Sequence, residues 1–259
     1  MRYIEELFSL KGKTAAIFGG CGVLGGQMAI ALANAGAKVA FLDRNKEGGL
    51  KCKEKIEQTG GEATIIYADV QKKETIEEAN NEIRSMWGRV DILINAAGVN
   101  SPTPFLDIPE EEWEHIMSVN LKGVFTACQV FGKAMIEDGK GGNIINISSV
   151  SSDIPLSKVF TYSISKAGVN NLTKFLAREW AEHHIRVNAI MPGFFPAEQN
   201  RKILTAERRA NILNHTPMHR YGEPFELTGA VIWLASDKAS SFVTGAIIPV
   251  DGGFTAMTI

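Results

Sequence analysis

The chain has 259 residues, of which 45% are hydrophobic and 22% charged, and its formal net charge is −2. This length and balance are typical of a globular α/β domain that can bury a large core. Because the chain has no basic excess to neutralise phosphates, its charge argues against nucleic acid as a partner.

The first residues and the most apolar window argue against secretion and against a membrane partner. The start, MRYIEELFSLKGK, carries two glutamates and lacks a long apolar run, unlike a secretory signal. Residues 15–42 are broken by glycines and polar side chains, so they form a poor membrane span. The three cysteines show neither pairing nor metal-ligand spacing, and we therefore expect a cytoplasmic protein that binds no metal.

Short β-rich runs alternate with helical patterns along the chain. Most runs are continuously apolar, as expected for strands covered on both faces. The predicted strands are 14–18, 38–42, 63–68, 90–94, 143–147, 185–190 and 246–250, and the predicted helices are 25–35, 46–58, 72–87, 110–138, 162–183, 205–214 and 224–236. This alternation predicts one α/β domain, 1–259, with a doubly wound parallel sheet of about seven strands and helices on both faces. The least regular stretch, 194–223, is predicted to be a substrate flap.

The stretch FGGCGVLGG, residues 18–26, follows the first predicted strand and opens the first helix. Glycines 19, 22 and 25 allow a sharp turn and let a pyrophosphate approach the amino end of the helix, where free N–H groups favour anions. The alternative is a tight turn between strand and helix without a ligand. Cys21 is either a thiol activated by the helix end or a small residue that fits the turn.

Asp43 ends the second predicted strand, about 20 residues after the turn, where a carboxylate can accept hydrogen bonds from an adenosine ribose. The same carboxylate would repel a 2′-phosphate, which predicts NAD(H) rather than NADP(H) as cofactor. Arg44 could pair with that phosphate, so NADP(H) remains an alternative. Asp43 could also serve as a helix N-cap.

Three polar residues in the second half carry the candidate chemistry. Tyr162 and Lys166, in YSISK, lie four residues apart on one face of a predicted helix. A nearby ammonium favours the phenolate, so Lys166 is expected to lower the pKa of Tyr162. Ser149, just past a predicted strand, could polarise a substrate carbonyl. Taken singly, each has a structural alternative, either a surface contact on the helix or a turn residue.

Together with INAAG (94–98), MSVNL (117–121) and MPG (191–193), these residues stand in the order and spacing of the short-chain dehydrogenase/reductase family. The chain resembles that family over nearly its whole length. The resemblance implies a Rossmann-type fold, a nicotinamide cofactor, a homotetramer, and hydride transfer involving a carbonyl or secondary alcohol.

The resemblance also implies roles for the candidate catalytic residues. Tyr162 would be the general acid/base, Lys166 would lower its pKa and hold the nicotinamide ribose, and Ser149 would orient the reacting carbonyl or hydroxyl. Asn120 resembles the family's asparagine that kinks a helix and carries a water for proton relay. Its alternative is a purely structural role within the helix.

The implied cofactor contacts lie in the turn, at the strand ends and on the active-site helix. Residues 68–70 resemble the segment beside the adenine, with Asp69 touching its amino group, and Ala96 stands where the family usually has a second asparagine. The implied cofactor-binding residues are Gly19, Gly22, Val23, Leu24, Gly25, Asp43, Arg44, Asp69, Val70, Asn95, Ala96, Ala97, Gly98, Tyr162, Lys166, Pro192 and Gly193.

Besides Ala96, three positions depart from the family pattern. Phe18 stands where the turn usually has a threonine, and Val23 where it has its middle glycine. We interpret the segment as a slightly altered phosphate turn in which Gly22 supplies a shifted glycine. Ala197 replaces a threonine often found four residues after the PG glycine, so contacts to the carboxamide are expected to differ there.

The stretch PGFFPAEQNRKIL, 192–204, resembles the sugar-acid branch of the family, described as mannonate oxidoreductase or fructuronate reductase. We therefore predict a carbohydrate-derived substrate, a sugar or a sugar acid similar to D-fructuronate or D-mannonate. A sugar acid needs a cation for its carboxylate and polar groups for its hydroxyls, which Gln199, Asn200 and Arg201 could supply. The alternative is that this stretch is the solvated start of a helix in the flap.

Other polar residues compete for contact with the substrate. Lys158 and Arg220 are rival cations for its carboxylate, and His215 or His219 could face it from the flap. The histidines show no metal-ligand spacing, and the pair at 183–184 is expected to end a helix.

Two other functions stay open. Within the family, the runner-up is a 3-oxoacyl-thioester reductase, which would usually prefer NADPH and a basic residue after the turn. From another class, the chain could be a non-catalytic dinucleotide-sensing protein. Ser149, Tyr162 and Lys166 favour the enzyme, since a sensor need not keep an acid/base tyrosine.

Overall fold

The computed structural model describes residues 2–195 and 205–257. Within these ranges, seven strands form one parallel sheet in the order β3-β2-β1-β4-β5-β6-β7. The strands are β1 (Thr14–Phe18), β2 (Lys38–Asp43), β3 (Ala63–Tyr67), β4 (Ile92–Asn95), β5 (Gly142–Ile147), β6 (Ile185–Pro192) and β7 (Ile247–Val250). The strand order reverses between β1 and β4, and at such a switch point the connections diverge and leave a crevice beyond the carboxyl ends of the strands.

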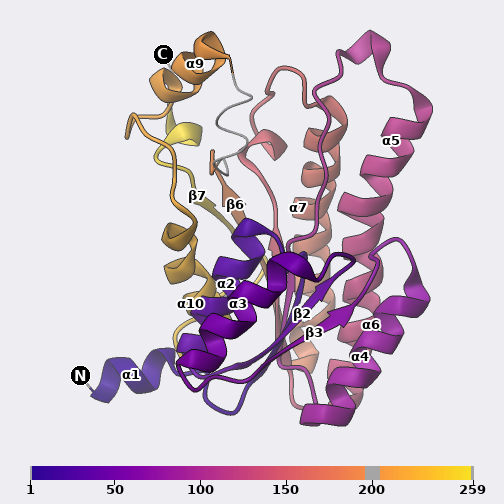
Figure 1. The fold of residues 1–259 in the computed structure, drawn as a ribbon, viewed down its shortest axis with the longest axis vertical. Coiled ribbons are helices and arrows are strands. Elements are labelled where there is room, and N and C mark those ends of the chain that lie inside the picture. The colour runs from indigo at the N-terminus through magenta and orange to yellow at the C-terminus, as the bar shows by residue number, and fades with distance from the viewer. Residues whose placement is uncertain (1, 196–204, 258–259) are drawn as a thin grey trace.

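Helices cover both faces of the sheet (Figure 1). On one face lie α2 (Val23–Asn34), α3 (Glu47–Gln58) and α10 (Thr228–Ala235). On the other face lie α4 (Lys73–Trp87), α6 (Gly123–Asp138) and α7 (Phe160–Trp180). Further helices are α1 (Arg2–Phe8), α5 (Glu110–Met117) and α9 (Ala206–His215). No helix in the described ranges combines the length and the apolar character needed to cross a membrane.

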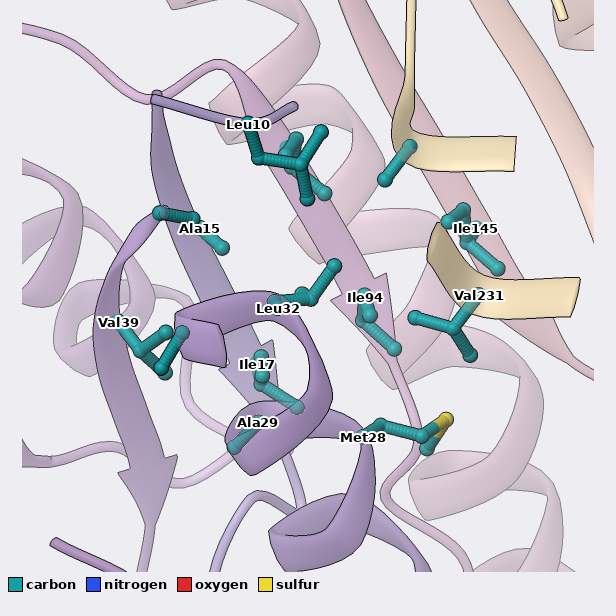
Figure 2. Packing of buried hydrophobic residues seen from close by; sticks show 14 of the residues in the cluster. Leu10, Ala15, Ile17, Met28, Ala29, Leu32, Val39, Ile94, Ile145 and Val231 are labelled. Carbon is teal, nitrogen blue, oxygen red and sulfur yellow. The ribbon is translucent and has the colours of Figure 1, made fainter. Parts of the chain in front are cut away.

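The central strands are apolar throughout because both of their faces are buried. Figure 2 shows Met28 and Leu32 of α2 packed over Ile17 of β1 and Ile94 of β4. On the opposite face, Phe18 packs edge-to-face on Phe131 of α6, with ring centroids 5.8 Å apart. The residue at position 18, where the resemblance implied a threonine, is therefore a core side chain.

The predicted strands and most helices are confirmed within a few residues, and three elements differ. The expected helix 110–138 is interrupted by a π-helical turn, Ser118–Lys122. The expected helix 224–236 starts as a 3₁₀ turn, Pro224–Leu227. Helix α1 was not predicted; it is only seven residues long and buries no side chain, although Ile4, Leu7 and Phe8 stand at helical spacing.

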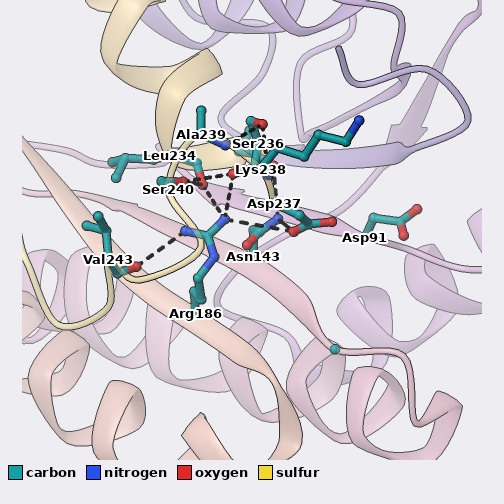
Figure 3. A network of polar contacts seen from close by, with 12 residues as sticks. Asp91, Asn143, Arg186, Leu234, Ser236, Asp237, Lys238, Ala239, Ser240 and Val243 are labelled. Atoms are coloured by element: carbon teal, nitrogen blue, oxygen red, sulfur yellow. Dashed lines mark hydrogen bonds and ion pairs between the residues drawn. The ribbon is translucent and has the colours of Figure 1, made fainter. Parts of the chain in front are cut away.

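A polar network ties β5 and β6 to the segment after α10 (Figure 3). The Nη2 atom of Arg186 donates to the carbonyl oxygens of Leu234 (2.9 Å) and Ser236 (3.2 Å). The Nδ2 atom of Asn143 donates to the carboxylate of Asp237 at 2.8 Å. These bonds hold the end of α10 against β5 and β6, on the side of the sheet away from the crevice.

Replacing Arg186 tests this network. Arg186→Met keeps the aliphatic stem but removes the donors to Leu234 and Ser236, so we expect a loss of about 1–3 kcal/mol in unfolding free energy. Urea unfolding followed by circular dichroism measures the loss. Arg2→Met, which removes an exposed ion pair with Glu6, is the matched control and should change little. Equal stability of the two variants would contradict the assigned role.

Candidate active site

A cavity of about 220 Å³ lies in the crevice at the switch point of the sheet. Among the predicted cofactor residues, those that line it are Gly19, Gly22, Asp43, Arg44, Val70, Ala96, Ala97 and Gly98. Four lining residues were missed, Leu42, Ala68, Val99 and Val119. Each of the four is directly next to a predicted site residue, and Ala68 and Val119 lie within the quoted segments 68–70 and 117–121.

The glycine turn has the geometry that an anion site requires. Gly19 has φ +71°, and a Cβ there would lie 2.7 Å from the backbone nitrogen of Ala97, so only glycine fits. Gly22 is the N-cap of α2, and it supplies no side-chain cap. The first N–H groups of α2 therefore lack partners within the helix and fit a pyrophosphate at the mouth of the cavity.

Gly25 serves the turn in another way. A Cβ on Gly25 would collide with the carbonyl oxygen of Gly19. The residue is buried, and it does not line the cavity. Position 25 requires glycine because the glycine turn packs directly on the first helical turn of α2.

Asp43 joins the second strand to the glycine turn. Its Oδ2 accepts a hydrogen bond from the backbone N–H of Cys21 (3.3 Å), and its Oδ1 accepts one from Asn45 (3.1 Å). Lys46 is the N-cap of α3, so the interpretation of Asp43 as a helix cap is wrong. Asp43 and Arg44 both line the cavity, where the carboxylate can face a ribose.

Cys21 is not an activated thiol. Burial and the carboxylate of Asp43 raise its pKa to about 11. Its sulfur lies against Gly49 of α3, where a Cβ would come within 2.5 Å of it. The alternative interpretation of Cys21, as a small residue that fits the turn, agrees with this packing.

Several predicted cofactor residues lie outside the cavity lining. Asp69 is buried, and its Oδ1 accepts a hydrogen bond from the backbone N–H of Gln71 at 3.0 Å. Asn95 is also buried and donates to Asn146 of β5 at 2.8 Å. Both support neighbouring residues that do line the cavity, Val70 and Ala96. The others outside the lining are Val23, Leu24, Gly25, Tyr162, Lys166, Pro192 and Gly193.

Pro192 and Gly193 lie at the same carboxyl edge of the sheet, beyond β5. They stand where β6 ends, and the N–H of Gly193 donates to the carbonyl oxygen of Val250 at 3.0 Å. A Cβ on Gly193 would lie 2.7 Å from the Cα of Asp251. Close approach of the chain to the end of β7 therefore explains this glycine without a ligand.

Ser149, Tyr162 and Lys166 come together where β5 ends against α7. Lys166 is 3% exposed, its ammonium donates to the carbonyl oxygen of Ile147 at 2.8 Å, and its Nζ lies 5.6 Å from the ring centroid of Tyr162. Ser149 and Tyr162 share a hydrogen bond between their side chains. A Cβ on Gly98 would lie 3.5 Å from the Lys166 Nζ, which places this group directly beside the cavity.

Burial controls the protonation of the group. It lowers the pKa of Lys166 to about 8. It also raises the pKa of Tyr162, and the hydrogen bond with Ser149 opposes that rise only in part. The sequence predicted that Lys166 lowers the Tyr162 pKa, but the net shift of this pKa in the folded protein is upward. The ammonium is bonded to the Ile147 carbonyl and lies near the ring, and its attraction does not outweigh the desolvation of the phenolate.

Asn120 lies in the π-helical turn and is fully buried. Its Oδ1 accepts from the N–H of Val99 (2.8 Å), and its Nδ2 donates to the carbonyl of Val99 (2.9 Å) and to Ser165 (3.1 Å). The side chain thus connects the loop after β4 to α7. The predicted distortion of the helix is confirmed, whereas the water relay stays a prediction.

The predicted substrate residues Gln199, Asn200 and Arg201 lie outside the described residues, as does Ala197. The rival cation Arg220 forms an ion pair with Glu226, with a shortest distance of 2.6 Å. Both residues line a second cavity, of about 350 Å³, beside the ends of β6 and β7.

The flap histidines make contacts within the chain. The ring of His215 packs on Phe254 with centroids 4.5 Å apart, and the Nδ1 of His219 is 3.2 Å from the carbonyl oxygen of Leu213. The pair at 183–184 ends α7 through a 3₁₀ turn, as predicted.

The chain matches known proteins over nearly its whole length. A family model described as enoyl-(acyl carrier protein) reductase matches residues 22–255. The uncharacterized oxidoreductase UxuB of Bacillus subtilis (strain 168) is 42% identical over an alignment 269 positions long, gaps included, that covers 96% of each chain.

Solved structures with the same fold hold nicotinamide dinucleotides. One is a proposed D-mannonate oxidoreductase from Haemophilus influenzae with bound NAD, at a TM-score of 0.92 and 38% identity, covering 98% of this chain and 99% of that chain. Another is a gluconate 5-dehydrogenase from Burkholderia cenocepacia in complex with NADP and tartrate, at a TM-score of 0.92 and 35% identity, covering 98% of this chain and 100% of that chain. Since the two hold different dinucleotides, they leave the cofactor preference of this chain open.

The burial of Lys166 predicts a pH-dependent stability. Its pKa falls from 10.5 to about 8 on folding, so the unfolded chain holds more protons between these values. The free energy of unfolding therefore rises with pH in this window. The cost of burying the charged ammonium is fully present well below pH 8, and it is progressively relieved as Lys166 loses its proton in the folded chain. Lys166→Met, which never carries the charge, should be more stable than the parent by about 1–3 kcal/mol at pH 7.

The difference in unfolding free energy between Lys166→Met and the parent, measured by urea unfolding, should shrink by about 2 kcal/mol between pH 7 and 9.5. Subtracting the two curves removes the contribution of the cysteines, whose raised pKa values act alike in both proteins. A difference that does not vary with pH would show that Lys166 titrates normally.

Proposed function

The chain belongs to the short-chain dehydrogenase/reductase family, and on this premise we propose that it transfers a hydride between NAD(H) and the carbonyl or secondary alcohol carbon of a sugar acid. The observation that carries the proposal is the buried group of Ser149, Tyr162 and Lys166 beside the cavity. Family membership makes the chain an NAD(P)-dependent oxidoreductase, and its relatives support a sugar-type substrate.

The nicotinamide dinucleotide supplies or accepts the hydride, and the residues of the chain handle position and protons. Gly19, Gly22 and the amino end of α2 would hold the pyrophosphate, and Asp43 the adenosine ribose. Ser149 and Tyr162 would both bond the reacting oxygen of the substrate.

Tyr162 would transfer the proton. Its hydroxyl is neutral at pH 7, because burial raises a pKa whose ordinary value is already 10.0. It can therefore protonate the oxygen that gains charge during reduction, and it takes the proton back during oxidation. The ammonium of Lys166 near its ring would stabilise the phenolate that remains. A pKa of about 8 leaves Lys166 mostly charged at pH 7.

The sugar-acid substrate, D-fructuronate or D-mannonate in type, is the finer part of the proposal. The named substrates of the gluconate and mannonate relatives support it. We further propose that 194–223 is the substrate flap and that Gln199, Asn200 and Arg201 bind the acid. A homotetramer and a cytoplasmic location also stay proposals.

A second candidate is reduction of a 3-oxoacyl thioester. The description of the family model, enoyl-(acyl carrier protein) reductase, favours an acyl thioester as substrate, although it names reduction of a carbon–carbon double bond. Assays with NADH and NADPH on a panel of keto-sugar acids, ketoses and acetoacetyl thioesters separate the two candidates. Turnover of the thioester alone would exclude the sugar acid. Absence of turnover with the whole panel, while NADH still binds, would favour the non-catalytic sensor.

Tyr162→Phe tests the acid/base. Because proton transfer is lost, we expect kcat to fall about 10²–10⁴-fold. Binding of NADH, followed by its fluorescence, should change less than about threefold, which is under 1 kcal/mol. Tyr3→Phe, at an exposed position far from the site, is the matched control. Turnover of the Tyr162 variant close to that of the control would remove Tyr162 from the mechanism.

Variants of Asp43 and Arg44 test the choice of cofactor. We predict that NAD(H) is preferred, and that Asp43→Ser raises kcat/KM for NADPH relative to NADH by about 10- to 100-fold, because the repulsion of the 2′-phosphate is gone. Arg44→Ala should lower whatever NADPH activity the parent has. If the parent already prefers NADPH, Arg44 outweighs Asp43 and the prediction is wrong.

A further inference from the structure

A serine next to the active site has no role in the mechanism described above. Ser151 lies in the 3₁₀ turn Val150–Ser152 that follows β5, and it is 4% exposed. Its backbone N–H donates to the Ser149 Oγ at 3.2 Å, and its own hydroxyl donates to the same oxygen at 3.1 Å. Two donors from one residue therefore converge on the Ser149 hydroxyl.

A hydroxyl oxygen has two acceptor sites and one proton. Ser151 fills both acceptor sites of Ser149, so the only bond left to Ser149 is one that it donates. We propose that Ser151 is a positioning residue that commits the Ser149 proton to the reacting oxygen of the substrate. This inference rests on the proposed oxidoreductase function.

The direction of the Ser149–Tyr162 bond agrees with this arrangement. The bond holds down the pKa of Tyr162 against the effect of burial. A bond donated to the phenolic oxygen favours the phenolate, so this effect agrees with Ser149 as the donor. A carbonyl oxygen brought to the same place would receive the same proton. Donation from Ser151 also polarises the Ser149 hydroxyl and makes it a stronger donor.

The backbone of Ser149 is held separately. The Oγ of Ser152 donates to the Ser149 carbonyl at 2.6 Å, and Asn170 of α7 donates to that Oγ at 2.8 Å. These bonds fix the Ser149 main chain to α7, the helix that carries Tyr162 and Lys166. What remains free is rotation of the Ser149 hydroxyl, and Ser151 restricts that rotation.

The test compares Ser151→Ala with Ser151→Thr, which keeps a hydroxyl. The matched control is Ser163→Ala, which removes a serine whose Oγ bonds the Val159 carbonyl within α7. In Ser151→Ala we expect kcat to fall about 3- to 10-fold with NADH affinity unchanged. In alcohol oxidation the pH midpoint of kcat/KM should rise by about 0.5–1 unit, because before substrate binds the Tyr162 phenolate loses part of the bond that Ser149 donates to it. Ser151→Thr should restore both values.

A second readout does not depend on turnover. In protein labelled with ¹³Cζ-tyrosine, assigned with Tyr162→Phe, the ionised fraction of Tyr162 is measured by NMR at the highest pH at which the fold is retained. Ser151→Ala should lower this fraction relative to the parent and to Ser163→Ala.

An unchanged ionised fraction, or a fall in kcat without a shift of the pH midpoint, would overturn the assignment of Ser151. A parent protein without turnover would contradict the proposed function instead, and the NMR comparison would still decide whether Ser151 orients Ser149.

Discussion

One buried charge organises the active site of this protein. The ammonium of Lys166 is removed from solvent, bonded to the Ile147 carbonyl and placed near the ring of Tyr162. Burying a cation is unfavourable unless polar groups compensate, and here the compensation is incomplete, because the pKa is lowered. The alignment of α7 on β5 therefore has to be maintained by other contacts, and it determines where the Tyr162 hydroxyl lies.

Those other contacts are buried polar side chains that join α7 to β5 and to the π-helical turn. Asn146 of β5 donates to Thr173 of α7 at 2.9 Å, and Asn120 donates to Ser165 at 3.1 Å. Each donor and acceptor would be costly to leave unpaired in the core, so a shift of α7 along the sheet is penalised at several points together. The same bonds that specify the packing of α7 thereby position the catalytic group.

The topology of the sheet brings this group to the cofactor cavity. The glycine turn and Asp43 come from the half of the chain that runs outward from β1, and Ser149, Tyr162 and Lys166 come from the half that starts at β4. The two halves meet at Gly98, which lies within contact distance of Lys166 and lines the cavity. A hydride donor and a proton donor can thus reach one substrate carbon and its oxygen from two independent parts of the fold.

The sequence alone determined the parallel sheet, the glycine turn and the Ser149, Tyr162 and Lys166 set, because continuous apolar runs and motif spacing are local patterns. Gly19 and Gly22 were predictable for the same reason, since the turn geometry that needs glycine is local. Only the tertiary structure decided the net direction of the Tyr162 pKa, which depends on burial by segments distant in sequence. It also decided which way the Ser149 hydroxyl donates, because the orientation of a single O–H bond depends on neighbours within hydrogen-bond distance and leaves no periodic signal in the chain.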